Sequence, residues 1–144
     1  MYRKLFIAIS INAVIMFALT YVMVEDAGHL YANINRAYMA LIMAAPMVTI
    51  MLLVMHSMFE DRTRNYLIHA AAIGAFLLIY FLIRSQTPVG NEQFLRSMIP
   101  HHSSAILMCD RAAISDQRII DLCGEIVPTQ EEEIAEMQRI LDSD

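Results

Sequence analysis

The residues best suited to chemistry lie between Met98 and Cys109, a stretch of twelve that holds two histidines, two methionines and a cysteine. Thioether, imidazole and thiolate groups are soft or borderline donors that suit copper, zinc or iron. Met98 stands three and four residues before the adjacent His101 and His102, the spacing that brings side chains together on a helix. Pro100 removes one helix hydrogen bond beside them. The pattern favours a metal site over a polar rim.

Much of the chain is too apolar for a soluble domain of this size. Of its 144 residues, 58% are hydrophobic, a composition that indicates a membrane protein. Residues 5–24, 38–59 and 66–83 are each long and apolar enough to span a bilayer. The first stretch does not end in a clean signal-peptidase site, so we interpret it as an uncleaved span. We therefore expect a transmembrane domain over residues 1–84.

Orientation follows from the arginines and lysines near the ends of the spans. One side has four, namely Arg3, Lys4, Arg62 and Arg64, and the other has three, namely Arg36, Arg84 and Arg96. This small excess favours a cytoplasmic N-terminus, and three spans then place the C-terminal part outside. In a bacterium the protein would lie in the inner membrane, with that part in the periplasm or at the cell exterior.

The second span carries methionines four residues apart, at Met39, Met43, Met47, Met51 and Met55. A row of thioethers could pass copper(I) along the helix. Four residues advance about 400° around a helix, however, so the row drifts by about 40° per step and winds around the cylinder. It therefore describes a packing ridge, which we favour, with conduction as the alternative.

After a linker at residues 85–91, two helical patterns follow over residues 92–114 and 117–142, joined by a turn near Asp116. No run alternates with period two, so the predicted fold class is all-α. The expected inward faces are Phe94, Met98, His102, Ala105, Cys109 and Ala112 on the first helix, and Ile119, Cys123, Ile126, Gln130, Glu133, Met137 and Ile140 on the second. We expect residues 92–144 to form an antiparallel helical hairpin that binds metal.

The position of the turn predicts which residues of the hairpin meet. With the turn near residue 116, Cys109 faces Cys123, His102 faces Gln130, and Met98 faces Ile134. The candidate metal residues are Met98, His101, His102, Gln130, Glu133 and Met137, with Met108 on the flank. Taken singly, Met108 and Met137 also fit core packing, and Glu133 fits a solvated acidic run. The facing cysteines could form a disulfide, remain thiols or bind copper(I).

A two-helix hairpin of about fifty residues cannot bury a core by itself. It must pack on the spans, on a partner or on copies of itself, and a dimer that completes a four-helix bundle is the simplest solution. Residues 85–144 contain eleven acids and four bases, so a basic footprint for nucleic acid is absent. The expected partners are therefore membrane lipid, a metal ion and further copies of the chain.

A series of residues from Phe94 to Met137 also follows a family pattern. They are Phe94-Leu95, Met98-Ile99-Pro100-His101-His102, Ala105-Ile106, Glu125-Ile126, Gln130, Glu133-Ile134 and Met137. This order resembles the bacterial domain of unknown function three hundred and five, whose pattern is F-L-x-x-M-I-x-H-H-x-x-A-I, then E-I-x-x-x-Q-x-x-E-I-x-x-M. The similarity covers about residues 91–141. This sequence differs from the usual pattern in two ways: Pro128 lies inside the second helix, and the chain has one hairpin where many members have two or more.

The resemblance implies a ferritin-like helical fold. Some members of that family are periplasmic copper-binding proteins, others are encoded beside metal-resistance genes, and forms with three N-terminal spans occur. By resemblance, Met98, His101, His102 and Met137 would bind the metal, with Gln130 and Glu133 as ligands or their supports.

The predicted function is that of a membrane-anchored metal-binding protein in extracytoplasmic copper handling or tolerance, with copper(I) or copper(II) ahead of zinc or iron. The alternatives are a copper transport component that uses the methionine-rich second span, and a metal-independent oligomerisation or interaction module. We expect no enzyme, because the sequence has no Glu-x-x-His pair, no Ser/His/Asp arrangement, no P-loop and no dinucleotide fingerprint.

Overall fold

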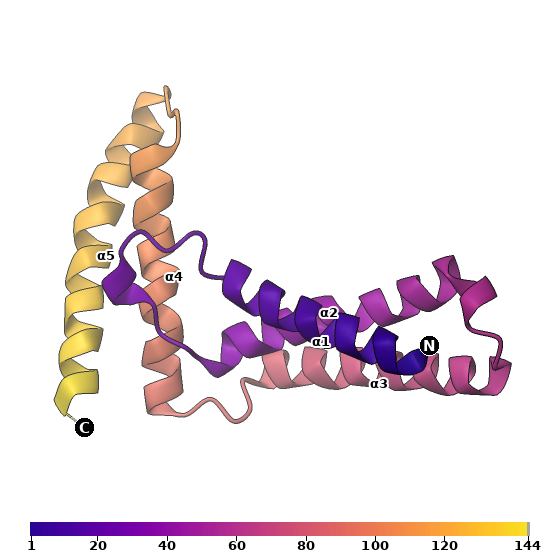
Figure 1. Cartoon of the computed structure of the whole chain (residues 1–144). Helices are drawn as coiled ribbons and strands as arrows, with labels where there is room; N and C mark the ends of the chain where they lie inside the picture. The colour runs from indigo at the N-terminus through magenta and orange to yellow at the C-terminus, as the bar shows by residue number, and fades with distance from the viewer. Residues whose placement is uncertain (144) are drawn as a thin grey trace. The chain divides into compact units, whose positions relative to one another are not determined.

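A computed structural model describes residues 1–143 and consists of α-helices joined by short connections (Figure 1). The α-helices are α1 (Tyr2–Leu19), α2 (Ile34–Val54), α3 (Arg62–Ser85), α4 (Asn91–Arg111) and α5 (Gln117–Ser143), and two 3-10 helices, η1 (Ala27–His29) and η2 (His56–Met58), lie between them. Residues 1–143 contain no β-strand. The predicted all-α class is confirmed.

Helices α1, α2 and α3 are each long and apolar enough to cross a membrane, as predicted. Their bounds differ from the predicted ones. The apolar residues 21–24 leave the helix after α1, and the Tyr21 hydroxyl donates a hydrogen bond to the carbonyl of Tyr31 at 2.9 Å. Helix α2 begins at Ile34 rather than residue 38, because the side chain of Gln93 accepts a hydrogen bond from the Ile34 N–H.

The chain divides into two compact units, described separately below. The first comprises Met1–Thr20 and Asn35–Pro88, and the second comprises Tyr21–Ile34 and the residues from Val89 onward. The connection between the first two spans thus packs with the C-terminal hairpin. A chain that crosses a bilayer at α1, α2 and α3 places these two segments on the same side, so this packing agrees with three crossings.

In the first unit, helix packing relies on small side chains and one apolar cluster. Ala40, Ala44 and Ala45 of α2 are buried, which lets neighbouring helices approach closely. Leu5, Leu52 and Phe59 form the cluster. Large side chains elsewhere on α1, α2 and α3 point outward, as required of helices that contact lipid.

The methionine row of α2 winds around the helix as its spacing requires. Met39 and Met43 are exposed on the helix surface, whereas Met51 and Met55 pack against the cluster of Leu5, Leu52 and Phe59. The row therefore passes from the outside of this unit to its interior and does not line one continuous face. This arrangement fits a packing ridge.

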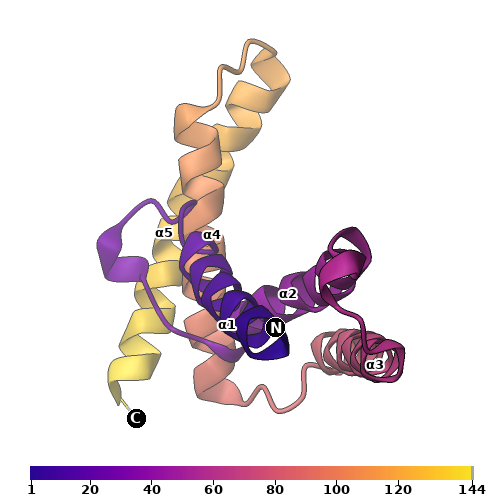
Figure 2. The same cartoon turned by 45° about the vertical axis from the view of Figure 1, so that its right-hand side comes forward.

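In the second unit, α4 and α5 lie side by side as an antiparallel hairpin (Figures 1 and 2). The turn spans residues 112–116, and the Asp116 carboxylate caps α5 by accepting the Arg118 N–H at 2.9 Å. The bonded Arg118 side chain holds the pKa of Asp116 below its ordinary value. Gly90 is the N-cap residue of α4, and the helix begins at Asn91.

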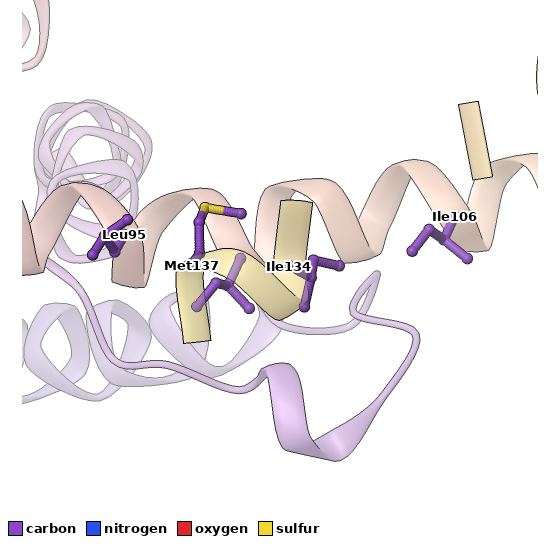
Figure 3. Close-up of a cluster of buried hydrophobic side chains, with 5 residues drawn as sticks. Leu95, Ile106, Ile134 and Met137 are labelled. Carbon is purple, nitrogen blue, oxygen red and sulfur yellow. The ribbon is translucent and has the colours of Figure 1, made fainter. Parts of the chain in front are cut away.

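The core of this unit differs from the predicted face of α4. Leu95, Ile99, Ile106, Ile134 and Met137 are buried together, and Figure 3 shows four of them projecting between the two helices. The predicted inward residue Phe94 is exposed, as are Ala112, Ile119, Glu133 and Ile140. The buried face of α4 is rotated about the helix axis from the predicted face, because α4 packs against Tyr21–Ile34 as well as against α5. Ser103 and Ile99 are therefore fully buried.

Candidate metal site

One pocket of the hairpin collects several of the predicted metal residues. Helix α4 contributes Phe94, Met98 and His102, and helix α5 contributes Glu133, Glu136 and Met137. Positions 94, 98 and 102 are one helical turn apart, and so are 133 and 137, so each helix presents one edge to the pocket. Two thioethers, one imidazole and two carboxylates thus meet at a single opening. The hairpin register predicts this meeting for Met98, His102, Glu133 and Met137, whereas the carboxylate of Glu136 was not predicted.

His102 is the residue of this pocket whose chemistry is most constrained. Its side chain is 13% exposed, and its Nδ1 lies 3.2 Å from Oε2 of Glu133, which is half exposed. That approach is not aligned as a hydrogen bond, and Nδ1 is buried without a hydrogen-bond partner. A buried nitrogen in this condition is costly unless something else binds it, and a metal ion is one such partner.

The protonation of His102 also favours metal binding. Burial lowers the pKa of its imidazole below the ordinary value, Glu133 opposes that shift, and the neighbouring His101 adds to it. The neutral imidazole, which has a free lone pair, is therefore the form that dominates at neutral pH. Metal ligation requires this neutral form.

Two substitutions next to His102 are expected to change its pKa in opposite directions. Replacing Glu133 with glutamine removes the charge that favours the imidazolium, so the pKa of His102 is expected to fall further. Replacing His101 with glutamine is expected to raise the pKa of His102. Titration of the His102 ring by NMR in metal-free protein measures both changes. Shifts of the same sign in the two variants would contradict this account of the pocket.

The remaining predicted ligands lie at different distances from the pocket. The Gln130 side chain donates a hydrogen bond of 3.4 Å to Glu133, so it is placed to support that carboxylate. His101 is exposed, with its ring centre 6.0 Å from that of His102. Met108 is 52% exposed and does not line the pocket. Among residues 1–143, no three His, Cys, Asp or Glu side chains are grouped to hold a metal ion, so ligation here would depend on thioethers.

The closed end of the hairpin is joined by a disulfide between Cys109 and Cys123, whose Cα atoms are 5.5 Å apart. This pair is the one predicted from the position of the turn. Of the three states that the sequence left open for these cysteines, the structure shows the disulfide, and it shows no free cysteine in the part it describes. The bond fixes the register of α4 against α5, and hence which residues meet at the metal pocket.

Sequence reasoning missed the role of Tyr21–Ile34, which we call the collar. The fully buried Ser103 hydroxyl accepts a hydrogen bond of 2.9 Å from the Glu25 N–H and lies 3.0 Å from Nδ1 of His29. Arg111 forms an ion pair of 3.7 Å with the Glu25 carboxylate. The available signal was topological, because two spans, α2 and α3, lie between the collar and the hairpin, and two crossings return the chain to the same side.

Together these features define a class of protein: three apolar helices long enough to span a membrane, attached to a disulfide-linked helical hairpin with a pocket of soft donors. Residues 81–141 match the family described as "Domain of unknown function (DUF305)". An uncharacterized protein of Acanthamoeba polyphaga mimivirus is 35% identical over 120 residues, which cover 82% of this chain and 77% of that protein. The chain belongs to the DUF305 family. No solved structure matches it.

Proposed function

We propose that this protein is a membrane-anchored metal-binding protein that holds copper on the non-cytoplasmic side of the membrane. The observation that carries the proposal is the buried Nδ1 of His102, which has no hydrogen-bond partner in a pocket that also contains Met98 and Met137. One imidazole and two thioethers form a donor set that suits copper(I) better than zinc or magnesium. Glu133 would act as a further ligand or hold His102 in place.

The location of the hairpin outside the cytoplasm has two independent supports. The excess of arginine and lysine at the N-terminal side of the spans favours a cytoplasmic N-terminus, and with three crossings α4 and α5 would lie on the opposite side. The disulfide between Cys109 and Cys123 belongs in an oxidising compartment, where such bonds persist. Both arguments lead to the same side of the membrane.

The test is metal retention by the full-length protein, purified in detergent without chelator. It is offered copper(I), copper(II) and zinc in separate samples, and the retained metal is measured by mass spectrometry. We expect copper(I) to be retained in stoichiometric amount and zinc to be lost on washing, because thioethers bind zinc poorly. The variant with Met98 and Met137 both replaced by leucine is expected to lose copper(I), and Met108→Leu serves as the matched control.

Two outcomes would overturn the proposal. Equal copper retention by the parent and the double leucine variant would show that the pocket is not the site. Retention of no metal, in a protein that still forms a stable oligomer, would favour the metal-independent interaction module. The exposed apolar side chains near the closed end of the hairpin are consistent with such an association, and they include Met108, Ile119, Ile120 and Leu122.

A further inference from the structure

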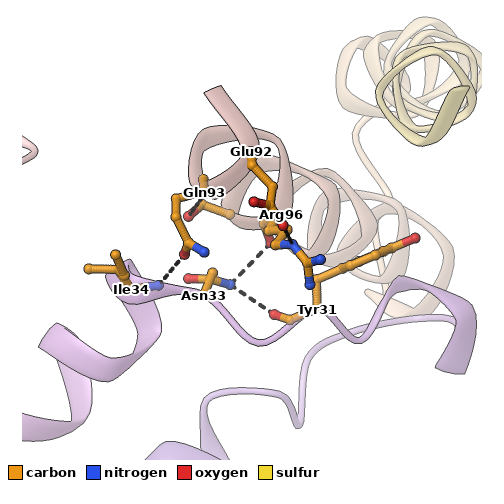
Figure 4. Close-up of polar contacts among 7 residues, drawn as sticks. Tyr31, Asn33, Ile34, Glu92, Gln93 and Arg96 are labelled. Atoms are coloured by element: carbon orange, nitrogen blue, oxygen red, sulfur yellow. Dashed lines mark hydrogen bonds and ion pairs between the residues drawn. The ribbon is translucent and has the colours of Figure 1, made fainter. Parts of the chain in front are cut away.

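The collar contacts α4 at a position that Pro100 creates. In an α-helix the carbonyl of residue 96 accepts a hydrogen bond from the N–H of residue 100, but proline has no N–H, so the Arg96 carbonyl loses its helical partner. The side chain of Asn33 donates a hydrogen bond of 3.1 Å to that carbonyl (Figure 4). Asn33 is only 6% exposed and also donates to the Tyr31 carbonyl at 3.0 Å. The collar therefore supplies the donor that the proline removes.

A second contact lies on the other side of the histidine pair. Ser103, which follows His102 directly, is fully buried and accepts the Glu25 N–H. Arg96 comes two residues before Met98, so the two collar contacts bracket the part of α4 that supplies the metal pocket with Met98 and His102. A shift of this turn relative to the collar would break one contact or the other.

The collar also shares an apolar core with the pocket. The Tyr31 side chain packs against the cluster that includes Met137, and Met98 packs against the same cluster. The Arg96 guanidinium lies 5.9 Å from the centre of the Tyr31 ring. Gln93 accepts the N–H of Ile34, the first residue of α2 (Figure 4). Hydrogen bonds and packing thus connect the metal residues to the segment that leads into the second span.

We propose that docking of the collar on α4 strengthens metal binding at the pocket, with Asn33 as the positioning residue that anchors the collar to α4. The inference rests on the proposed function, since it concerns the regulation of that site. Because coupling between two equilibria is reciprocal, metal binding stabilises the docked collar to the same extent that the docked collar strengthens metal binding.

The first test compares Asn33→Ala with Asn91→Ala in the full-length protein. Asn91 is an exposed asparagine at the start of α4, so it controls for the loss of an amide side chain. We expect copper(I) affinity, measured by competition with a chelator, to fall about tenfold in Asn33→Ala, the lower end for residues that support metal ligands. Asn91→Ala should match the parent. Parental affinity in Asn33→Ala would overturn the coupling.

Pro100 offers a second variant that separates this role from general stability. In Pro100→Ala the new N–H bonds the Arg96 carbonyl, so the Asn33 side chain becomes redundant there. The Asn33→Ala change should therefore cost clearly less affinity in the Pro100→Ala background than in the parent. Equal costs in both backgrounds would show that Asn33 does not act through this carbonyl.

Amide hydrogen exchange in the metal-free protein provides a readout that does not depend on copper. The amides of Glu25 and Ile34 should be protected in the parent and exchange at least about tenfold faster in Asn33→Ala, because both are bonded to α4. Adding copper(I) should slow their exchange in the parent only. A parent that retains no copper would refute the proposed function and its coupling, whereas unchanged exchange in metal-free Asn33→Ala would refute the anchoring alone.

Discussion

Replacing His102 with alanine is expected to weaken copper(I) binding by about 100-fold or more, whereas the same change at His101 should cost less than tenfold. Loss of a residue that supports a metal ligand costs about 10- to 100-fold, so loss of a ligand costs at least the upper value. His102 lies in the pocket with Met98 and Met137, but His101 is exposed beside it. The adjacent histidines are thus not equivalent.

The measurement is a competition titration of copper(I) against a chromophoric chelator, with the full-length protein in detergent. The two alanine variants are matched controls for each other, because they remove the same side chain from neighbouring positions of one helix. Circular dichroism should show that both retain the parental helix content. Equal losses in the two variants would mean that both imidazoles bind the metal, and a larger loss at His101 would refute the assignment of the pocket.

Replacing both Cys109 and Cys123 with serine is expected to lower the free energy of unfolding of the second unit by about 3 kcal/mol. The bond closes a loop of about fifteen residues, and a closed loop of that length restricts the unfolded chain by about this amount. This contribution is a large share of the unit's stability because its core contains few buried side chains. The double variant should therefore unfold at a clearly lower denaturant concentration.

Denaturant unfolding, followed by circular dichroism with and without a reducing agent, measures this contribution. Reductant should lower the midpoint of the parent toward that of the double serine variant and leave the variant unchanged. Copper affinity should fall as well, because the bond sets the register that brings Met98 and His102 opposite Met137. Equal midpoints for parent and variant would show that packing alone holds the closed end.

The features that the sequence predicted correctly depend on local periodicity. The spans follow from apolar length, and the pairing of Cys109 with Cys123 follows from one turn and a constant rise per residue. The bounds were less accurate, because residues 21–24 are apolar enough for a span but belong to the collar, within which the Tyr21 hydroxyl donates a hydrogen bond to the Tyr31 carbonyl. The topology predicts on which side the collar lies, but not its individual contacts with Arg96 and Ser103, which join residues more than sixty positions apart.

Local helical spacing also predicted part of the candidate site. Helical spacing identified Met98 and His102 as neighbours, and the register brought Glu133 and Met137 opposite them. Adjacent residues differ by about 100° around a helix, so His101 and His102 do not enter one pocket on the same edge. The face of α4 was assigned as though α5 were its only neighbour, and packing against the collar rotates it so that Phe94 becomes exposed.

The second unit is built from two separate segments of the chain, and this limits the order in which it can assemble. The collar is synthesised before α2 and α3, while its partners Arg96 and Ser103 come after them. Ser103 therefore meets the Glu25 N–H, 78 positions earlier, only when both later spans have been made and have returned the chain to the same side. Formation of the second unit thus depends on correct insertion of all three spans, and a fragment that begins at Val89 would lack part of its own core.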